Sequence, residues 1–335
     1  MRMYNSCLDF MKGIACIFVI FMHCEFPGRL GIFTQTISRF CVPFFFMVSG
    51  YFSYRSMTIG CDSHGIYAIF NKKVKHILQL IVGSTVVYLS FVIIQSLLFN
   101  NINWSVHPER ILQLICFNRP FIISGQYWFL FALLYVYVLY AVIERYNLYK
   151  QSYYLAAFMF VLYFSLAQGM HAFGGSVPNF YYRNFLVEGF PFFMLGHWIH
   201  KNQSNLCINN NLLLALIALT TILCIPERYL FRRDFGVNIM TLPQVFCLFL
   251  YAVNNPLKNN GLIQEMGKRY SMYIYILHPI IWYTLRYVYD YLHISDNLIA
   301  QYLMPIEVLV FTILLSFIVE GANRSISKKI QISNA

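Results

Sequence analysis

Charged side chains are scarce in this sequence, and their scarcity indicates the class of protein. Only 11% of the 335 residues are charged, whereas 59% are hydrophobic and 19% are aromatic. Soluble domains carry about 25% charged residues, and disordered chains combine few apolar residues with many charges. The composition therefore excludes a disordered chain and argues against a soluble enzyme or a nucleic-acid-binding protein, despite a net charge of +11. The class of protein that the composition leaves is a polytopic helical membrane protein.

Metal-binding cysteine pairs are missing as well. The sequence has nine cysteines but no Cys-x-x-Cys pair, and most of the nine lie within apolar runs. Neither a zinc site nor a disulfide framework is indicated, so we expect no metal and no permanently bound cofactor. The first apolar run is not followed by a small-residue cleavage site, which favours a retained transmembrane helix over a signal peptide.

Long hydrophobic runs are abundant, and they predict an all-α fold of about ten transmembrane helices, each of about 20 mostly apolar residues. Their approximate ranges are 8–26, 37–54, 76–99, 127–143, 153–168, 184–200, 210–226, 237–253, 270–291 and 303–322. The fifth and seventh are short. No internal repeat is visible, and no segment is long enough for an appended soluble domain. We therefore expect a single transmembrane domain over residues 1–335.

The basic residues predict how the helices are oriented. Cytoplasmic loops are enriched in Lys and Arg, and placing both termini in the cytoplasm puts every loop lysine on the inner side. We therefore expect a multi-pass protein of the cytoplasmic membrane. The cations on the predicted outer side are all arginines, namely Arg29, Arg39, Arg110, Arg119, Arg183, Arg228, Arg232 and Arg233. Topology alone disfavours these exterior arginines, so they need another explanation.

The first predicted helix carries three ionisable side chains, Asp9, Lys12 and His23. Ionisable residues at membrane depth are costly and mark candidate functional sites. Lys12 and His23 share one helix face and lie about 16 Å apart along the axis, because eleven residues make about three turns. Asp9 lies three residues before Lys12 and is close enough to pair with it. The alternative is a lysine that extends to the membrane surface and an interfacial histidine.

The late helix 270–291 carries a second polar face. Its polar and aromatic residues recur at helical spacing: Ser271, Tyr275, His278, Trp282 and Arg286. Pro279 has no N–H to donate, so the helix should kink beside His278 and leave a carbonyl near Tyr275 without its helical partner. A structural, hydrogen-bonded histidine among packing aromatic residues is the alternative.

The sixth predicted helix places Glu188 below its exterior end. An isolated carboxylate there would be protonated or would pair with a cation. Arg183 is the nearest candidate in the sequence, and Arg39 and Arg119 are others. A structural ion pair and a catalytic carboxylate are both compatible with this pattern. We interpret His197 and His200, at the other end of the helix, as interfacial residues.

Taken together, four segments resemble the acyltransferase family 3, whose members are membrane proteins that O-acylate cell-surface carbohydrates. The basic residue at position 12 is often Arg in the family, and Lys retains the charge but not the bidentate geometry. The matching segments are residues 8–13 continuing to His23, residues 41–51 with Ser49 and Gly50, residues 127–130 with Trp128, and residues 275–279 with Tyr275, His278 and Pro279.

The resemblance implies an acyl-CoA donor, such as acetyl-CoA, on the cytoplasmic side. It implies a carbohydrate acceptor, such as an exopolysaccharide, O-antigen or capsule, at the exterior face. His23 would be the general base for a sugar hydroxyl or would itself carry the acyl group. Glu188 and His278 are further catalytic candidates. Lys12, Lys72, Lys73 and Lys75 would bind the donor phosphates, whereas Arg39, Arg119, Arg183 and Trp128 would bind the acceptor or stabilise an oxyanion. Asp9, Ser49, Gly50, Tyr275 and Pro279 would be structural.

Three other functions fit parts of the pattern. A transporter or flippase for a lipid-linked glycan fits the helix number and the exterior arginines, but it predicts repeat symmetry. A glycan polymerase would need a large exterior loop. A membrane scaffold would leave the buried ionisable residues without a role. The acceptor sugar and the oligomeric state do not follow from the sequence.

Overall fold

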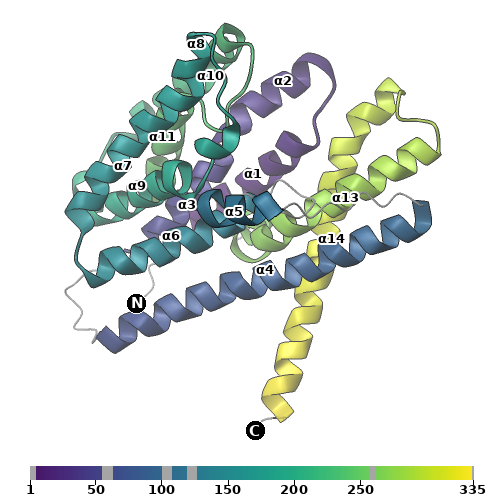
Figure 1. Ribbon diagram of the computed structural model, residues 1–335, viewed down its shortest axis with the longest axis horizontal. Helices are drawn as coiled ribbons and strands as arrows, with labels where there is room; N and C mark the ends of the chain where they lie inside the picture. Colours follow the sequence, from purple (N-terminus) through teal and green to yellow (C-terminus); the bar gives the residue numbers. More distant parts are fainter. Residues whose placement is uncertain (1–4, 55–62, 100–107, 119–126, 257–260, 334–335) are drawn as a thin grey trace. The chain divides into compact units, whose positions relative to one another are not determined.

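A computed structural model describes residues 5–54, 63–99, 108–118, 127–256 and 261–333 of the chain (Figure 1). Every regular element in these ranges is helical, as predicted. The helices are α1 (Ser6–His23), α2 (Gly28–Ile37), α3 (Cys41–Tyr51), α4 (Ser63–Phe99), α5 (Pro108–Phe117), α6 (Trp128–Arg145), α7 (Tyr149–Phe164), α8 (Met170–Ala172), α9 (Phe190–Lys201), α10 (Asn210–Phe231), α11 (Thr241–Asn254), α12 (Leu262–Glu265), α13 (Ser271–Tyr291) and α14 (Leu298–Ser333). Single π-helical turns occur at Ser165–Gly169 (η3), Phe185–Gly189 (η5) and Met266–Tyr270 (η7).

Seven stretches of the described helices are long and apolar enough to cross a membrane. They correspond to seven of the predicted spans. The other three predicted spans are also helical but fall short of that measure. α9 and α11 are shorter, with 12 and 14 residues, and α13 has 21 residues but is rich in tyrosine. The described part of the chain is therefore all-helical, which agrees with a multi-pass membrane protein. The helix number of ten and the orientation of the termini stay predictions.

The contacts divide the chain into two compact units. The first unit comprises residues 1–41, 209–228 and 240–335, and α1 contacts α2, α11, α12, α13 and α14 within it. Two glycines allow α1 to approach its neighbours closely. A Cβ on Gly13 would lie 2.0 Å from the Ile263 carbonyl oxygen, and one on Gly267 would lie 1.8 Å from the Asp9 carbonyl oxygen. No larger residue fits these positions without movement of the backbone.

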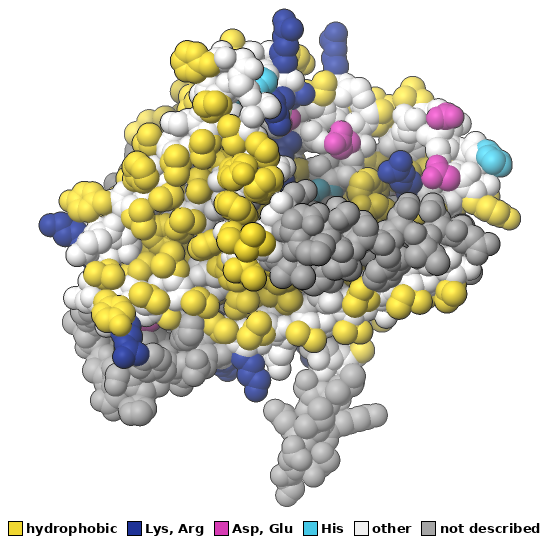
Figure 2. Space-filling view, viewed as in Figure 1, with side chains coloured by type: hydrophobic (Ala, Val, Ile, Leu, Met, Phe, Trp, Pro, Cys, Tyr) yellow, Lys and Arg dark blue, Asp and Glu magenta, His cyan; other side chains and the backbone are white. Residues whose placement is uncertain are grey.

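The second unit comprises residues 42–208 and 229–239. Its core includes α6, α7 and α9, and α3 crosses α9 where a Cβ on Gly50 would meet the Phe193 carbonyl oxygen at 1.8 Å. The Ser49 hydroxyl donates to the Phe45 carbonyl at 2.9 Å. Figure 2 shows hydrophobic side chains covering the face over α7, where Tyr154, Phe158 and Val161 are mostly exposed. An apolar outer surface of this kind is typical of helices that face lipid.

Candidate active site

The first helix presents its ionisable residues in the predicted pairing. Asn5 caps α1 by accepting hydrogen bonds from the backbone N–H groups of Cys7 and Leu8. One turn later, Lys12 Nζ lies 2.6 Å from Asp9 Oδ1, and both side chains are largely buried. The Asp9–Lys12 ion pair is therefore confirmed. Because the pair is largely buried, its mutual attraction is stronger than that of a surface pair.

His23 and His278, which are remote in the sequence, meet within the first unit. Their ring centroids lie 5.4 Å apart, and the ring planes are inclined by 26°, so the two imidazoles stack. His23 is the last residue of α1, and His278 is buried in α13. The sequence indicated both histidines separately but contained no signal that they would touch. A stacked pair of imidazoles resists double protonation, because two positive rings at this distance repel.

The backbone determines which nitrogen of His278 carries the proton. Nδ1 lies 3.0 Å from the Ile274 carbonyl oxygen, and a carbonyl can only accept, so Nδ1 is the protonated nitrogen. The other nitrogen, Nε2, is then the basic one. It is buried and has no hydrogen-bond partner among the described residues. Pro279 follows directly, and its missing N–H leaves the Tyr275 carbonyl without the usual helical donor.

Glu188 lies in the second unit, on the π-helical turn η5. Asn184 begins this turn by accepting hydrogen bonds from the N–H groups of Leu186 and Val187. The carboxylate is only 1% exposed. The Arg183 guanidinium does not pair with it. Its Cζ atom stacks over the Trp128 ring at 4.8 Å, and its buried Nε has no hydrogen-bond partner among the described residues. Arg183 is the cation nearest to Glu188 in the sequence, but the structure shows no ion pair between these two described residues.

Tyr163, Gly236 and Tyr182 lie near Glu188, and none of the three was predicted from the sequence. The Val237 N–H donates to the Tyr163 hydroxyl at 2.7 Å. A Cβ on Gly236 would lie 2.9 Å from that hydroxyl oxygen, 3.3 Å from Glu188 Oε2 and 3.5 Å from Arg183 Cδ. Tyr182 packs edge-on against Tyr163, and burial raises the pKa of the Tyr182 phenol while nearby Arg233 opposes that rise. In the sequence, the signal for this place was Gly236 directly after the residues Arg-Arg-Asp-Phe.

Comparison with known proteins identifies the family. The family model described as an acyltransferase domain, of acyltransferase family 3, matches residues 5–321. This chain belongs to the acyltransferase family 3. It is also 24% identical to a serine/alanine racemase of Enterococcus gallinarum, over 93% of this chain and 45% of that protein. The chain thus spans about half the length of that relative. No solved structure matches.

The predicted donor lysines lie in different environments. Lys73 Nζ donates to Ser53 Oγ at 2.8 Å and to the Phe52 carbonyl at 3.4 Å, and it lies 5.1 Å from the centre of the Tyr137 ring. Lys72 and Lys75 are exposed on α4. Lys73 is therefore oriented by the end of α3, whereas its two neighbours are accessible to a ligand.

The other two predicted acceptor arginines are Arg39 and Arg119. Arg39 belongs to the first unit, where its Nη1 atom lies 3.9 Å from Met22 Sδ. Arg119 lies outside the described residues. The structure therefore brings together Glu188, Arg183 and Trp128 in the second unit, and His23 with His278 and Lys12 with Asp9 in the first.

His197 is buried within the second unit, and its position at the membrane interface stays a prediction. The side chain is 2% exposed, its Nδ1 lies 2.8 Å from the Tyr153 hydroxyl, and its ring stacks on Tyr149 at 5.4 Å. His200 Nδ1 lies 2.6 Å from the Tyr51 carbonyl oxygen. Tyrosines from other helices supply the burial, and a helix-end position in the sequence does not reveal them.

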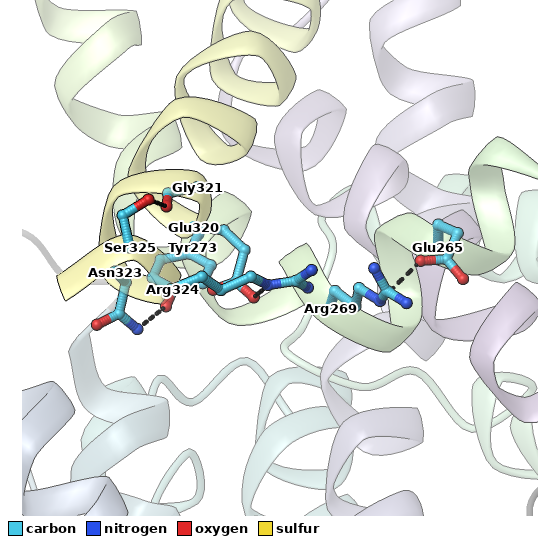
Figure 3. Close-up of polar contacts among 8 residues, drawn as sticks. All are labelled: Glu265, Arg269, Tyr273, Glu320, Gly321, Asn323, Arg324 and Ser325. Atoms are coloured by element: carbon cyan, nitrogen blue, oxygen red, sulfur yellow. Dashed lines mark hydrogen bonds and ion pairs between the residues drawn. The ribbon is translucent and has the colours of Figure 1, made fainter. Parts of the chain in front are cut away.

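Two arginines of the first unit are paired with acidic residues four positions earlier in the chain (Figure 3). Arg269 Nε lies 2.9 Å from Glu265 Oε2, and Arg324 Nε lies 2.7 Å from Glu320 Oε1. A hydrogen bond of 3.0 Å from the Asn323 amide to the Tyr273 hydroxyl links α14 to α13. Solvent screens these accessible pairs, so each contributes little to stability, which favours a structural interpretation.

Proposed function

We propose that the protein is a membrane O-acyltransferase that moves an acyl group, in the simplest case acetyl, from cytoplasmic acyl-CoA to a hydroxyl group. The acceptor is a cell-surface polysaccharide or a lipid-linked glycan at the exterior face of the cytoplasmic membrane. Family membership supports the reaction class. The stacked pair of His23 and His278 is the single observation that carries the assignment of the reacting centre.

The reaction needs one group that first accepts and then returns a proton. In our proposal His23 takes the proton of the sugar hydroxyl as its oxygen attacks the thioester carbonyl, forming the new C–O bond. The C–S bond then breaks, and the imidazolium returns the proton to the departing CoA thiolate. The products are the O-acyl sugar and free CoA. An imidazole suits this cycle because its ordinary pKa lies near the working pH.

His278 supports this cycle through its charge state. Because its Nδ1–H is bound to the Ile274 carbonyl, its basic Nε2 is the nitrogen left for a partner. A neutral neighbour stacked on His23 allows His23 to become positive, whereas a second imidazolium would oppose it. We therefore assign His23 as the base and His278 as the residue that stays neutral beside it.

The donor and acceptor roles follow the charges. Lys12, Lys72, Lys73 and Lys75 provide positive charge for the phosphates of acyl-CoA, which carry several negative charges. Lys12 is already paired with Asp9, so its contribution is smaller than that of exposed Lys72 and Lys75. At the exterior face, Arg183, Trp128, Arg39 and Arg119 bind the acceptor or stabilise the oxyanion. Glu188 orients the acceptor or acts as a catalytic carboxylate.

The test is transfer by membranes that contain the full chain. His23→Ala is expected to abolish transfer of labelled acetyl from acetyl-CoA to the isolated surface glycan, with protein levels unchanged. His76→Ala is the matched control, because His76 is exposed on α4 and has no proposed role. Normal transfer by His23→Ala would refute both the base role and an acyl-histidine intermediate. Loss of one acyl mass per glycan repeat in a deletion strain would identify the acyl group.

A further inference from the structure

Two arginines of the second unit lack an acidic partner. Arg183 and Arg233 form no ion pair with any residue that the structure describes, and the Arg183 Nε is buried without a hydrogen-bond partner there. The buried Nε makes Arg183 the costly one, because a buried guanidinium nitrogen needs a compensating group. Arg233 is exposed and accessible from solvent. Both arginines can therefore take an external anion.

Aromatic rings hold both guanidinium groups by one face. Arg183 Cζ lies 4.8 Å from the centre of the Trp128 ring, and Arg233 Cζ lies 5.2 Å from the centre of the Phe235 ring. Stacking on a ring orients the planar group and leaves its N–H edge available for hydrogen bonds. Such an edge matches the two oxygens of a carboxylate or a phosphate.

The backbone of the second unit brings the two arginines to the same place. Gly236 lies against the Arg183 side chain, because an added Cβ would be 3.5 Å from Arg183 Cδ. Arg233 is three residues away on the same segment, and both arginines act electrostatically on the Tyr182 phenol. Glu188 adjoins this place, because its Oε2 would lie 3.3 Å from the same added Cβ, but it is only 1% exposed. Asp234 Oδ1 accepts a hydrogen bond from Asn238 at 3.4 Å.

We propose that Arg183 and Arg233 together bind an anionic group, a phosphate or a carboxylate, on the acceptor glycan. The proposal rests on the function proposed above, because that function supplies the acceptor. It narrows the acceptor to a charged glycan, such as one with uronic acid or phosphodiester groups. It also accounts for two of the exterior arginines that the topology of the chain disfavours.

The test is a binding titration of the purified full chain in nanodiscs of phosphatidylcholine, which has no net charge. Glucose 6-phosphate, glucuronate and glucose are the probes. At least one anionic sugar is expected to bind at least tenfold more tightly than glucose, and its affinity should fall as salt rises. Arg233→Gln and Arg183→Gln should each weaken that binding about tenfold. Arg29→Gln, an exposed exterior arginine of α2, is the matched control and should leave it unchanged.

Several outcomes overturn the proposal. The first is equal affinity of the chain for glucose and for both anionic sugars. The second is unchanged affinity for the anionic sugar in Arg233→Gln. Arg233 is exposed, so this variant is expected to fold. Loss of probe binding to the wild-type chain when the nanodiscs contain phosphatidylglycerol would assign the arginines to a lipid headgroup instead. The preferred probe distinguishes phosphate from carboxylate. The titration needs no acyl-CoA, so its failure and a failure of acyl transfer are separate results.

Discussion

At the scale of single residues, the informative side chains are the few that are charged or titratable inside apolar helices. Asp9 and Lys12 form an ion pair of 2.6 Å on α1. Such a pair has two possible roles. It can compensate two charges that would otherwise be costly in the membrane, or it can hold Lys12 ready for a phosphate. The two roles differ in what happens when each partner is removed.

Asp9→Asn is expected to destabilise the protein by about 3 kcal/mol, because it leaves the largely buried Lys12 ammonium without its counter-charge. The double variant Asp9→Asn with Lys12→Met should recover most of that loss, since neither charge remains. Detergent-induced unfolding, followed by circular dichroism, measures both variants against the wild-type chain. A double variant no more stable than Asp9→Asn would contradict the view that charge compensation dominates.

At the scale of helices, the sequence predicted where most elements lie but not how closely they approach. The hydrophobic runs located α1, α6, α10 and α14 because a spanning helix is a local property of about 20 residues. Contacts between distant segments are not local. His23 stacks on His278, and Gly236 approaches Glu188. The two residues of each contact are far apart in the sequence, so no helical periodicity predicts that they meet.

Gly267→Ala is expected to destabilise the first unit by about 1–3 kcal/mol, because overpacking a tight contact forces the backbones apart. Its Cβ would lie 1.8 Å from the Asp9 carbonyl oxygen. Gly321→Ala is the matched control. Gly321 lies in helix α14 with nothing within 4 Å of an added Cβ, so alanine there should stabilise by about 0.5–1 kcal/mol. Thermal unfolding midpoints measure both, and equal midpoints would contradict the close approach of α1 and η7.

At the scale of the whole molecule, the distribution of charge predicts the orientation that the proposed reaction needs. Donor lysines must face the cytoplasm, where acyl-CoA is found, and acceptor arginines must face outward. The loop lysines and the exterior arginines separate in that way only if both termini are cytoplasmic. Two exposed, free cysteines test this directly, because Cys116 lies in the predicted outer segment after the third span and Cys207 in a predicted inner loop.

A membrane-impermeant maleimide added to intact cells is expected to label Cys116 and to spare Cys207. Exposed thiols react readily, whereas the other described cysteines, such as Cys16 and Cys41, are buried. Cys116→Ser should therefore remove the external labelling, and Cys207→Ser should leave it unchanged. Permeabilised cells supply the control, since both thiols should then react. External labelling that disappears in Cys207→Ser would invert the orientation, and it would place the proposed donor lysines on the side of the membrane without acyl-CoA.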